Sequence, residues 1–226
     1  MKRLFLILFV VTAITDLVAV TFNLATVNFI AKPLIIPALA VYYLSARQQR
    51  SSLFLMALFF CWLGDVLLMF AGELYFMAGL VAFLTGHMLY ILCYRKFKMA
   101  GSGLNGPQRV RYAFPIALAG TGLVTVLYPH LGSLQIPVMV YALVITVMAL
   151  QALFRYGHTS KSSFILVLCG AISFMISDSL LAVNKFMHAL PLSGLAIMLT
   201  YILAQYLIVE GVLKHDVGMN TNTGKL

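Results

Sequence analysis

Charged residues are scarce in this chain of 226 residues: they make up 9% of it, and only six of them are acidic. Apolar residues account for 62% of the chain, and the mean hydropathy is +1.01. Soluble globular domains carry about 25% charged residues, so this composition lies far outside their range. It excludes a soluble enzyme or binding module and predicts an integral membrane protein.

Cysteine and buried histidine are also scarce. Cys61, Cys93 and Cys169 all fall in apolar runs without the spacing of a metal site, so buried thiols are expected rather than a disulfide framework. His87 is the only histidine well inside an apolar run. A zinc hydrolase needs more ligands than this at membrane depth, so that class is disfavoured.

Long apolar runs fill the chain from end to end. Each is about 18 to 22 residues long, enough to cross a hydrocarbon core of roughly 30 Å at 1.5 Å per residue. Asp16 interrupts the first run and no convincing cleavage site follows it, so we expect a retained helix rather than a signal peptide. The sequence predicts an all-α, polytopic helix bundle and a single integral membrane domain over 1–226. The predicted spans are 4–22, 29–46, 52–71, 75–94, 110–128, 134–154, 163–183 and 192–213.

Basic residues predict the orientation of this bundle. Lysine and arginine near helix ends are retained in the cytoplasm. All but two of the 15 basic residues fall on one side of the predicted spans, which places both termini in the cytoplasm. The two exceptions are Lys32 and Lys185. The 13 on the cytoplasmic side are Lys2, Arg3, Arg47, Arg50, Arg95, Lys96, Lys98, Arg109, Arg111, Arg155, Lys161, Lys214 and Lys225. The net charge of +9 therefore signals topology and attraction to anionic membrane lipids, not nucleic-acid binding.

Four of the six acidic residues lie inside predicted spans: Asp16, Asp65, Asp178 and Glu210. A charged carboxylate at bilayer depth costs at least about 2.5 to 3.5 kcal/mol, so such residues usually face the bundle interior and pair, protonate or act. Asp65 and Asp178 are predicted in the outer half of the membrane, in the same layer as Lys32. Asp16 lies at a comparable depth, whereas Glu210 is closer to the cytoplasmic end and is interpreted as interfacial.

Two segments around the aspartates resemble each other. Gly64-Asp65-Val66-Leu67-Leu68 and Ser177-Asp178-Ser179-Leu180-Leu181 share a small-Asp-x-Leu-Leu pattern, and a second polar helix follows each. This predicts a four-plus-four parallel repeat with both aspartates facing one cavity. The downstream polar residues are His87 and Tyr90 after the first segment, and Tyr201 and Gln205 after the second. They either line this cavity or make ordinary interhelical hydrogen bonds.

These motifs together resemble the YhhN family of membrane proteins, whose characterised members are lysoplasmalogenases. The likeness covers nearly the whole chain, through Lys32-Pro33-Leu34, Gly64-Asp65, Gly86-His87-x-x-Tyr90 and the segment from Ser177 to Phe186. The resemblance implies a lysophospholipid substrate. It also implies hydrolysis of the vinyl ether bond of a lysoplasmalogen, which releases a fatty aldehyde and glycerophosphoethanolamine or glycerophosphocholine.

The predicted residues suit this chemistry, which needs one acid and one anion. The acid protonates the alkene carbon, and water attacks the resulting oxocarbenium ion. Two carboxyl groups in a cavity of low dielectric constant divide these roles, as in glycosidases. Asp65 and Asp178 are the predicted pair, with either as the acid. Lys32 keeps one of them ionised or binds phosphate, and Asn184 and Lys185 suit the headgroup. The side chains expected to orient water and the glycerol hydroxyl are His87, Tyr90, Tyr201 and Gln205. The scheme requires no metal or organic cofactor.

Two other classes of function fit the same residues. Paired intramembrane carboxylates, a lysine and a repeat are also features of small proton-coupled transporters. A non-catalytic lipid-binding or scaffold protein is a third interpretation, and it would tolerate Asp65→Asn and Asp178→Asn far better. The short loops and charge asymmetry favour a bacterial inner membrane, and the same pattern would also serve in an endoplasmic reticulum membrane. The sequence indicates no oligomeric state.

Overall fold

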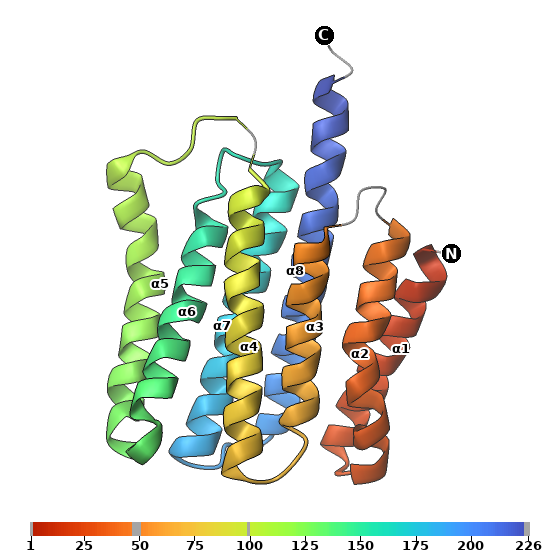
Figure 1. Ribbon diagram of the computed structural model, residues 1–226, viewed down its shortest axis with the longest axis vertical. Coiled ribbons are helices and arrows are strands. Elements are labelled where there is room, and N and C mark those ends of the chain that lie inside the picture. Colours follow the sequence, from red (N-terminus) through yellow and green to blue (C-terminus); the bar gives the residue numbers. More distant parts are fainter. Residues whose placement is uncertain (1, 47–50, 99, 224–226) are drawn as a thin grey trace. The chain divides into compact units, whose positions relative to one another are not determined.

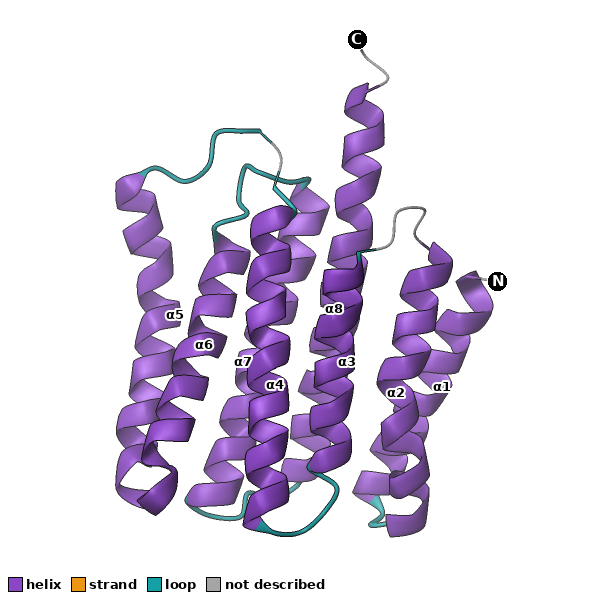
Figure 2. Ribbon diagram, viewed as in Figure 1, coloured by secondary structure: helices purple, strands orange, loops and turns teal. Residues whose placement is uncertain are grey.

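The computed structural model describes residues 2–46, 51–98 and 100–223, with side chains up to residue 215. Arg47, Arg50 and Lys225, which contributed to the predicted orientation, lie outside these residues. The described chain is all-α, as predicted, and contains no strand (Figure 1, Figure 2). Its α-helices are α1 (Lys2–Thr21), α2 (Ala25–Ala46), α3 (Ser52–Leu67), α4 (Glu73–Lys96), α5 (Gly106–Leu127), α6 (Gln135–Leu153), α7 (Lys161–Phe186) and α8 (Ser193–Thr223). Two short 3-10 turns, Tyr128–His130 and Gly132–Leu134, connect α5 to α6.

Seven of the eight described helices are long and apolar enough to cross a membrane. The exception is α3, whose 16 residues extend about 24 Å. Its predicted span, 52–71, was too long: the helix ends at Leu67, and Met69 and Phe70 donate their N–H groups to Val66 and Leu67 in tight turns. The residues of these turns are apolar, so hydropathy continued the span through them. The fold is that of a multi-pass integral membrane protein.

The chain forms two compact units, residues 1–90 and 91–226, with the boundary inside α4. In the first unit α1 packs against α2, and α2 against α3. In the second unit α6 packs against both α5 and α7, and α7 makes an extensive antiparallel contact with α8. The four-plus-four repeat and the single domain stay predictions.

Local signals explain several helix ends. After α1, Asn23 adopts a positive φ of 54°, while Leu24 N–H bonds to the carbonyl of Ala19 at 2.8 Å, as in a Schellman motif. The Asn105 side chain caps α5 and forms a capping box with Gln108. Ser160 caps α7 by accepting a hydrogen bond from Ser163 N–H. The side-chain caps satisfy backbone N–H donors at the starts of α5 and α7, and the Schellman motif satisfies carbonyl acceptors at the end of α1.

Glycines allow α7 and α8 to approach closely. A Cβ atom on Gly170 would lie 2.9 Å from the carbonyl oxygen of Ala204, and one on Gly211 would lie 2.9 Å from the backbone nitrogen of Val167. Small residues of this kind let membrane helices pack through their backbones, since lipid supplies no hydrophobic drive to join them. Asp178 is therefore located on a helix that packs closely against its neighbour α8.

A buried arginine fixes the turn between α6 and α7. Arg155 is fully buried, and it donates to the carbonyl of Phe97 at 3.4 Å and to Ser163 Oγ at 3.0 Å. Ser163 Oγ in turn donates to the carbonyl of Gly211 at 2.6 Å. Burial lowers the pKa of Arg155 to about 10, although Tyr94 acts in the opposite direction. Arg155, one of the predicted cytoplasmic residues, therefore joins the α6–α7 turn to Phe97 and to the start of α7, and Ser163 in turn joins α7 to α8.

Candidate active site

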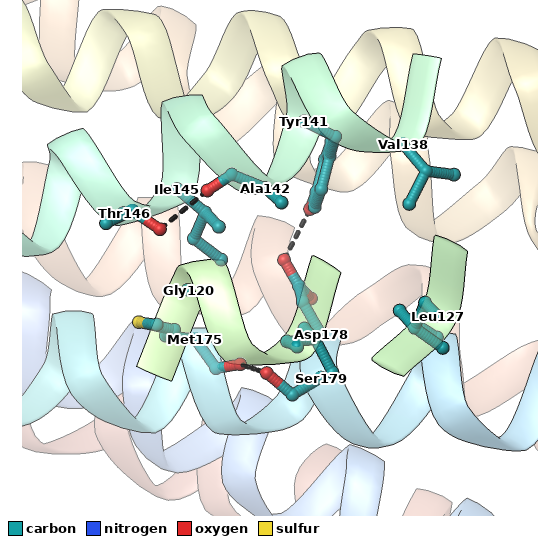
Figure 3. A pocket seen from close by; sticks show the side chains of 12 residues that line it. Gly120, Leu127, Val138, Tyr141, Ala142, Ile145, Thr146, Met175, Asp178 and Ser179 are labelled. Carbon is teal, nitrogen blue, oxygen red and sulfur yellow. Dashed lines mark hydrogen bonds between the residues drawn. The ribbon is translucent and has the colours of Figure 1, made fainter. Parts of the chain in front are cut away.

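The second unit places Asp178 of α7 opposite Tyr141 of α6. The Tyr141 hydroxyl donates a short hydrogen bond to Oδ2 of Asp178, and both side chains line a cavity between α5, α6 and α7 (Figure 3). The cavity has a volume of about 30 Å³, which is enough for a water molecule. Tyr141 therefore orients the carboxylate beside a space that a water molecule can occupy.

The other hydroxyl groups of this cavity are satisfied within their own helices. Thr146 donates to the carbonyl of Ala142 at 2.7 Å, and Ser179 donates to that of Met175 at 2.6 Å (Figure 3). Gly120 completes the wall, since a Cβ atom there would lie 2.2 Å from Thr146 Oγ1. The polar chemistry of the cavity is thus concentrated at Asp178 and Tyr141.

Two predicted orienting residues meet on α8. Gln205 Nε2 donates to the Tyr201 hydroxyl at 3.3 Å, and both side chains are buried. The Tyr201 ring packs edge-on against Phe174, with centroids 5.3 Å apart. Phe174 lies four residues before Asp178 on α7, about one helical turn. The structure therefore places the Tyr201–Gln205 pair one turn along α7 from the carboxylate.

The predicted headgroup residues lie at the end of α7. Asn184 Oδ1 accepts a hydrogen bond from the backbone N–H of Leu190 at 3.0 Å, which holds the connection to α8 in place. Lys185 follows it and is exposed. Asn184 thus has a structural role in this turn, and Lys185 presents a cation within about 11 Å of Asp178, measured along the helix axis.

In the first unit, Asp65 is buried on the last turn of α3, with 4% of its surface exposed. One turn earlier, Trp62 Nε1 donates to the carbonyl of Pro33 at 2.9 Å. This carbonyl lacks its usual helical partner because Pro37, four residues on, has no N–H group. The carbonyl that Pro37 leaves free is therefore bonded by Trp62, the only tryptophan of the chain. This bond holds the Lys32-Pro33 segment beside the helical turn that leads to Asp65.

A second buried carboxylate of this unit, Asp16 of α1, accepts a hydrogen bond from Asn28 Nδ2 at 2.8 Å. Asp16 is fully buried. Lys32 is four residues after Asn28, so it lies on the same face of α2 as the residue that bonds to Asp16. Lys32 was predicted to serve Asp65, Asp178 or a phosphate. The structure associates it with Asp16, a carboxylate that the predicted catalytic pair leaves out.

His87 and Tyr90 of α4 lie alongside the part of α3 that precedes Asp65. His87 is fully buried and stacks on Phe83 with ring centroids 6.5 Å apart. Tyr90 packs against Phe54, whose ring is 5.7 Å away. Phe54 precedes Asp65 by 11 residues, about 16 Å along α3. Tyr90 therefore belongs to an aromatic cluster toward the opposite end of the helix from Asp65.

Tyr141 is the contact that the sequence prediction missed. The tyrosine lies in a mostly apolar helix, 37 residues before Asp178, and no motif marks it. Its only signal is that a phenolic hydroxyl in hydrocarbon needs a partner, which is true of every tyrosine in the bundle. Asp65 and Asp178 belong to different units, so their pairing remains a prediction.

The helices and buried polar side chains define a multi-pass α-helical membrane protein with carboxylates inside its bundle. Within that class, the chain belongs to the YhhN family, whose sequence profile matches residues 27–212.

Several relatives of the chain carry the name lysoplasmalogenase. Human lysoplasmalogenase TMEM86A is 31% identical over 170 residues, covering 74% of this chain and 67% of the relative. A lysoplasmalogenase of Mycobacterium tuberculosis is 31% identical over 140 residues, which are 60% of this chain and 50% of that protein. Human lysoplasmalogenase TMEM86B is 30% identical over 155 residues, 68% of this chain and 60% of the relative. The matched segments thus span between half and two thirds of these relatives. No solved structure matches the chain.

Proposed function

We propose that the protein hydrolyses the vinyl ether bond of lysoplasmalogens in a bacterial cytoplasmic membrane. The products are a fatty aldehyde and glycerophosphoethanolamine or glycerophosphocholine. The observation that carries the proposal is the membership of a family whose relatives are named lysoplasmalogenase, together with the Tyr141–Asp178 pair beside a water-sized cavity. The substrate is a single-chain lipid whose scissile bond lies just below its headgroup, so a buried membrane site suits it.

The proposed reaction uses two carboxyl groups. One donates a proton to the alkene carbon distal to the ether oxygen, which converts the C–O–C group to an oxocarbenium ion. The other takes a proton from water as the water oxygen bonds to the cationic carbon, and a hemiacetal forms. Collapse of the hemiacetal breaks the carbon–oxygen bond to glycerol, as the carboxyl that took a proton from water gives it to the glycerol oxygen and the other carboxylate takes the proton of the hemiacetal hydroxyl. Both carboxyl groups thus return to their starting states, and one aldehyde and one alcohol leave for each water consumed.

In this scheme Asp178 is the base, because Tyr141 holds its carboxylate beside the space for water, and Asp65 is the acid. Lys185 contributes charge to the phosphate at the end of α7. Tyr201 and Gln205, which pack together one turn from Asp178, support this face of α7. His87 stacks on Phe83, whose ring lies against Gly64, the residue before Asp65. Lys32 lies one helical turn from Asn28, the hydrogen-bond partner of Asp16, in the first unit.

The test is fatty aldehyde release from alkenyl-glycerophosphoethanolamine by the purified protein. The parent should release aldehyde, whereas Asp65→Asn and Asp178→Asn should each lose about 10²- to 10⁴-fold in kcat, as expected when an acid–base group is removed. Thermal unfolding of each variant in detergent controls for folding. Proton-dependent flux in sealed vesicles without aldehyde would replace the hydrolase with the transporter alternative.

A further inference from the structure

A long apolar groove runs along the second unit between α5 and α7. Its volume is about 560 Å³, and its α7 wall extends from Leu168 to Val183. These residues are 15 positions apart, so the wall is about 22 Å long. Apart from Tyr112 and Ser179, the side chains that line the groove are hydrocarbon or thioether. The groove therefore has the dimensions and chemistry of a site for a hydrocarbon chain.

The groove adjoins the small cavity that holds Asp178. Met175 and Ser179 line both, and they flank the carboxylate on α7. The Ser179 hydroxyl donates its hydrogen bond to the Met175 carbonyl, so it adds little polarity to the groove. A chain lying in the groove would therefore pass beside Asp178 without burying an unsatisfied polar group.

The position of Asp178 divides the groove unequally. From Asp178 to Leu168 is ten residues, about 15 Å, whereas from Asp178 to Val183 is about 7 Å. The longer part matches half of a hydrocarbon core of roughly 30 Å, the depth that one lipid chain occupies. The shorter part ends beside Lys185, an exposed cation suited to a lipid phosphate. Length and charge thus give the occupant a direction.

We propose that this groove binds the single hydrocarbon chain of the lysolipid, with its tail toward Leu168 and its phosphate toward Lys185. This proposal rests on the proposed function for the identity of the lipid. Bound in this way, the vinyl ether, which joins the chain to glycerol, lies beside Asp178 and Tyr141. The end of the groove at Leu168 then sets the preference for chain length.

A matched pair of substitutions on α7 tests the assignment. Ile172 lines the groove six residues from Asp178, whereas Ile165 is comparably exposed on the same helix but does not line it. Ile172→Trp should raise KM for a long-chain alkenyl lysolipid by tenfold or more, because each methylene excluded from an apolar site costs about fourfold in affinity. It should leave a short-chain substrate within about twofold, and Ile165→Trp should change neither.

A binding experiment makes the groove independent of hydrolysis. The probe is a saturated-ether lysolipid with a diazirine on its chain, which the parent protein cannot cleave. Photolabelling should concentrate on the groove residues of α5 and α7, and unlabelled lysolipid should compete while a two-chain phospholipid should not. Labelling spread evenly over all helices, or equal competition by the two-chain lipid, would overturn the assignment.

The two experiments separate the proposals. Specific labelling of the groove without aldehyde release from any substrate would refute the hydrolase and keep the groove as a lysolipid site. Aldehyde release with no specific labelling, and with identical chain preference in Ile172→Trp and the parent, would keep the hydrolase and refute the groove.

Discussion

Tyr141 shows how one side chain on a neighbouring helix can determine the geometry of a membrane carboxylate. Its hydroxyl donates to Asp178 inside a cavity that is otherwise lined by apolar groups and by hydroxyls bonded to carbonyls of their own helices. A hydrogen bond to a charged group contributes about 1.5 to 3 kcal/mol, and more of that contribution is felt where water cannot replace it. The bond therefore holds the Asp178 carboxylate at the wall of the cavity.

Tyr141→Phe removes this bond and keeps the ring. We expect kcat for aldehyde release to fall roughly 10- to 100-fold, the rate equivalent of about 1.5 to 3 kcal/mol, while KM stays within about threefold. Tyr128→Phe is the control, because Tyr128 is exposed just after α5 and does not line the cavity. A Tyr141→Phe enzyme with full kcat would show that Asp178 needs no orienting partner and would remove Tyr141 from the site.

The charged residues inside the helices could be predicted from the sequence, but their hydrogen-bond partners could not. Asp16, Asp65, Asp178 and Lys32 could be identified from the sequence because a charge inside an apolar run is anomalous by itself. Their partners could not, since Asn28 and Tyr141 are common residues in such helices. The link between Trp62 and Pro33 depends on a carbonyl freed by Pro37 and on the packing of α3 against α2. Contacts between helices are properties of the packed bundle, and they leave no local pattern.

At the scale of the element, hydropathy and length predicted where helices lie but not how they end or pack. The α3 helix ends four residues before its predicted limit because its last apolar residues form turns. The close approach of α7 and α8 depends on two glycines, which the sequence does not distinguish from glycines with open surroundings. Gly170 would place a Cβ atom 2.9 Å from a backbone oxygen, whereas Gly122 has nothing within 4 Å.

This difference predicts opposite effects for the same substitution. Gly170→Ala forces α7 and α8 apart and should destabilise the protein by about 1 to 3 kcal/mol, the usual cost of overpacking. Gly122→Ala, on α5, should be neutral or stabilise by up to about 1 kcal/mol, because alanine is the better helix former. The free energy of unfolding in mixed micelles measures both. Equal stability of the two variants would mean that the α7–α8 contact is loose enough to absorb a methyl group.

At the scale of the whole molecule, charge is distributed unequally over the two ends of α5. The segment before and at its start carries Lys98, Arg109 and Arg111, whereas the 3-10 turns after it contain neither lysine nor arginine. Burial, and then repulsion by Arg109, Arg95 and Arg155, lower the pKa of Lys98, which shows how closely these cations gather. The eight helices and the charge bias together were enough to predict an orientation, since both depend on composition along the chain and not on packing.

The orientation can be measured with single cysteines at the two ends of α5. Ser102→Cys lies in the basic α4–α5 connection, and Ser133→Cys lies in the 3-10 turn beyond α5; both positions are exposed. Cys169 is replaced by alanine in each variant, since it is the exposed native thiol among the three cysteines. In sealed right-side-out vesicles, an impermeant thiol reagent should label the cysteine at position 133 at once and the one at 102 only after permeabilisation. The reason is that translocating the cluster around Lys98 and Arg109 would oppose the retention of basic residues in the cytoplasm. The reverse pattern would invert the bundle, place Asp65 and Asp178 in the cytoplasmic half of the membrane, and require the substrate to enter from the inner leaflet.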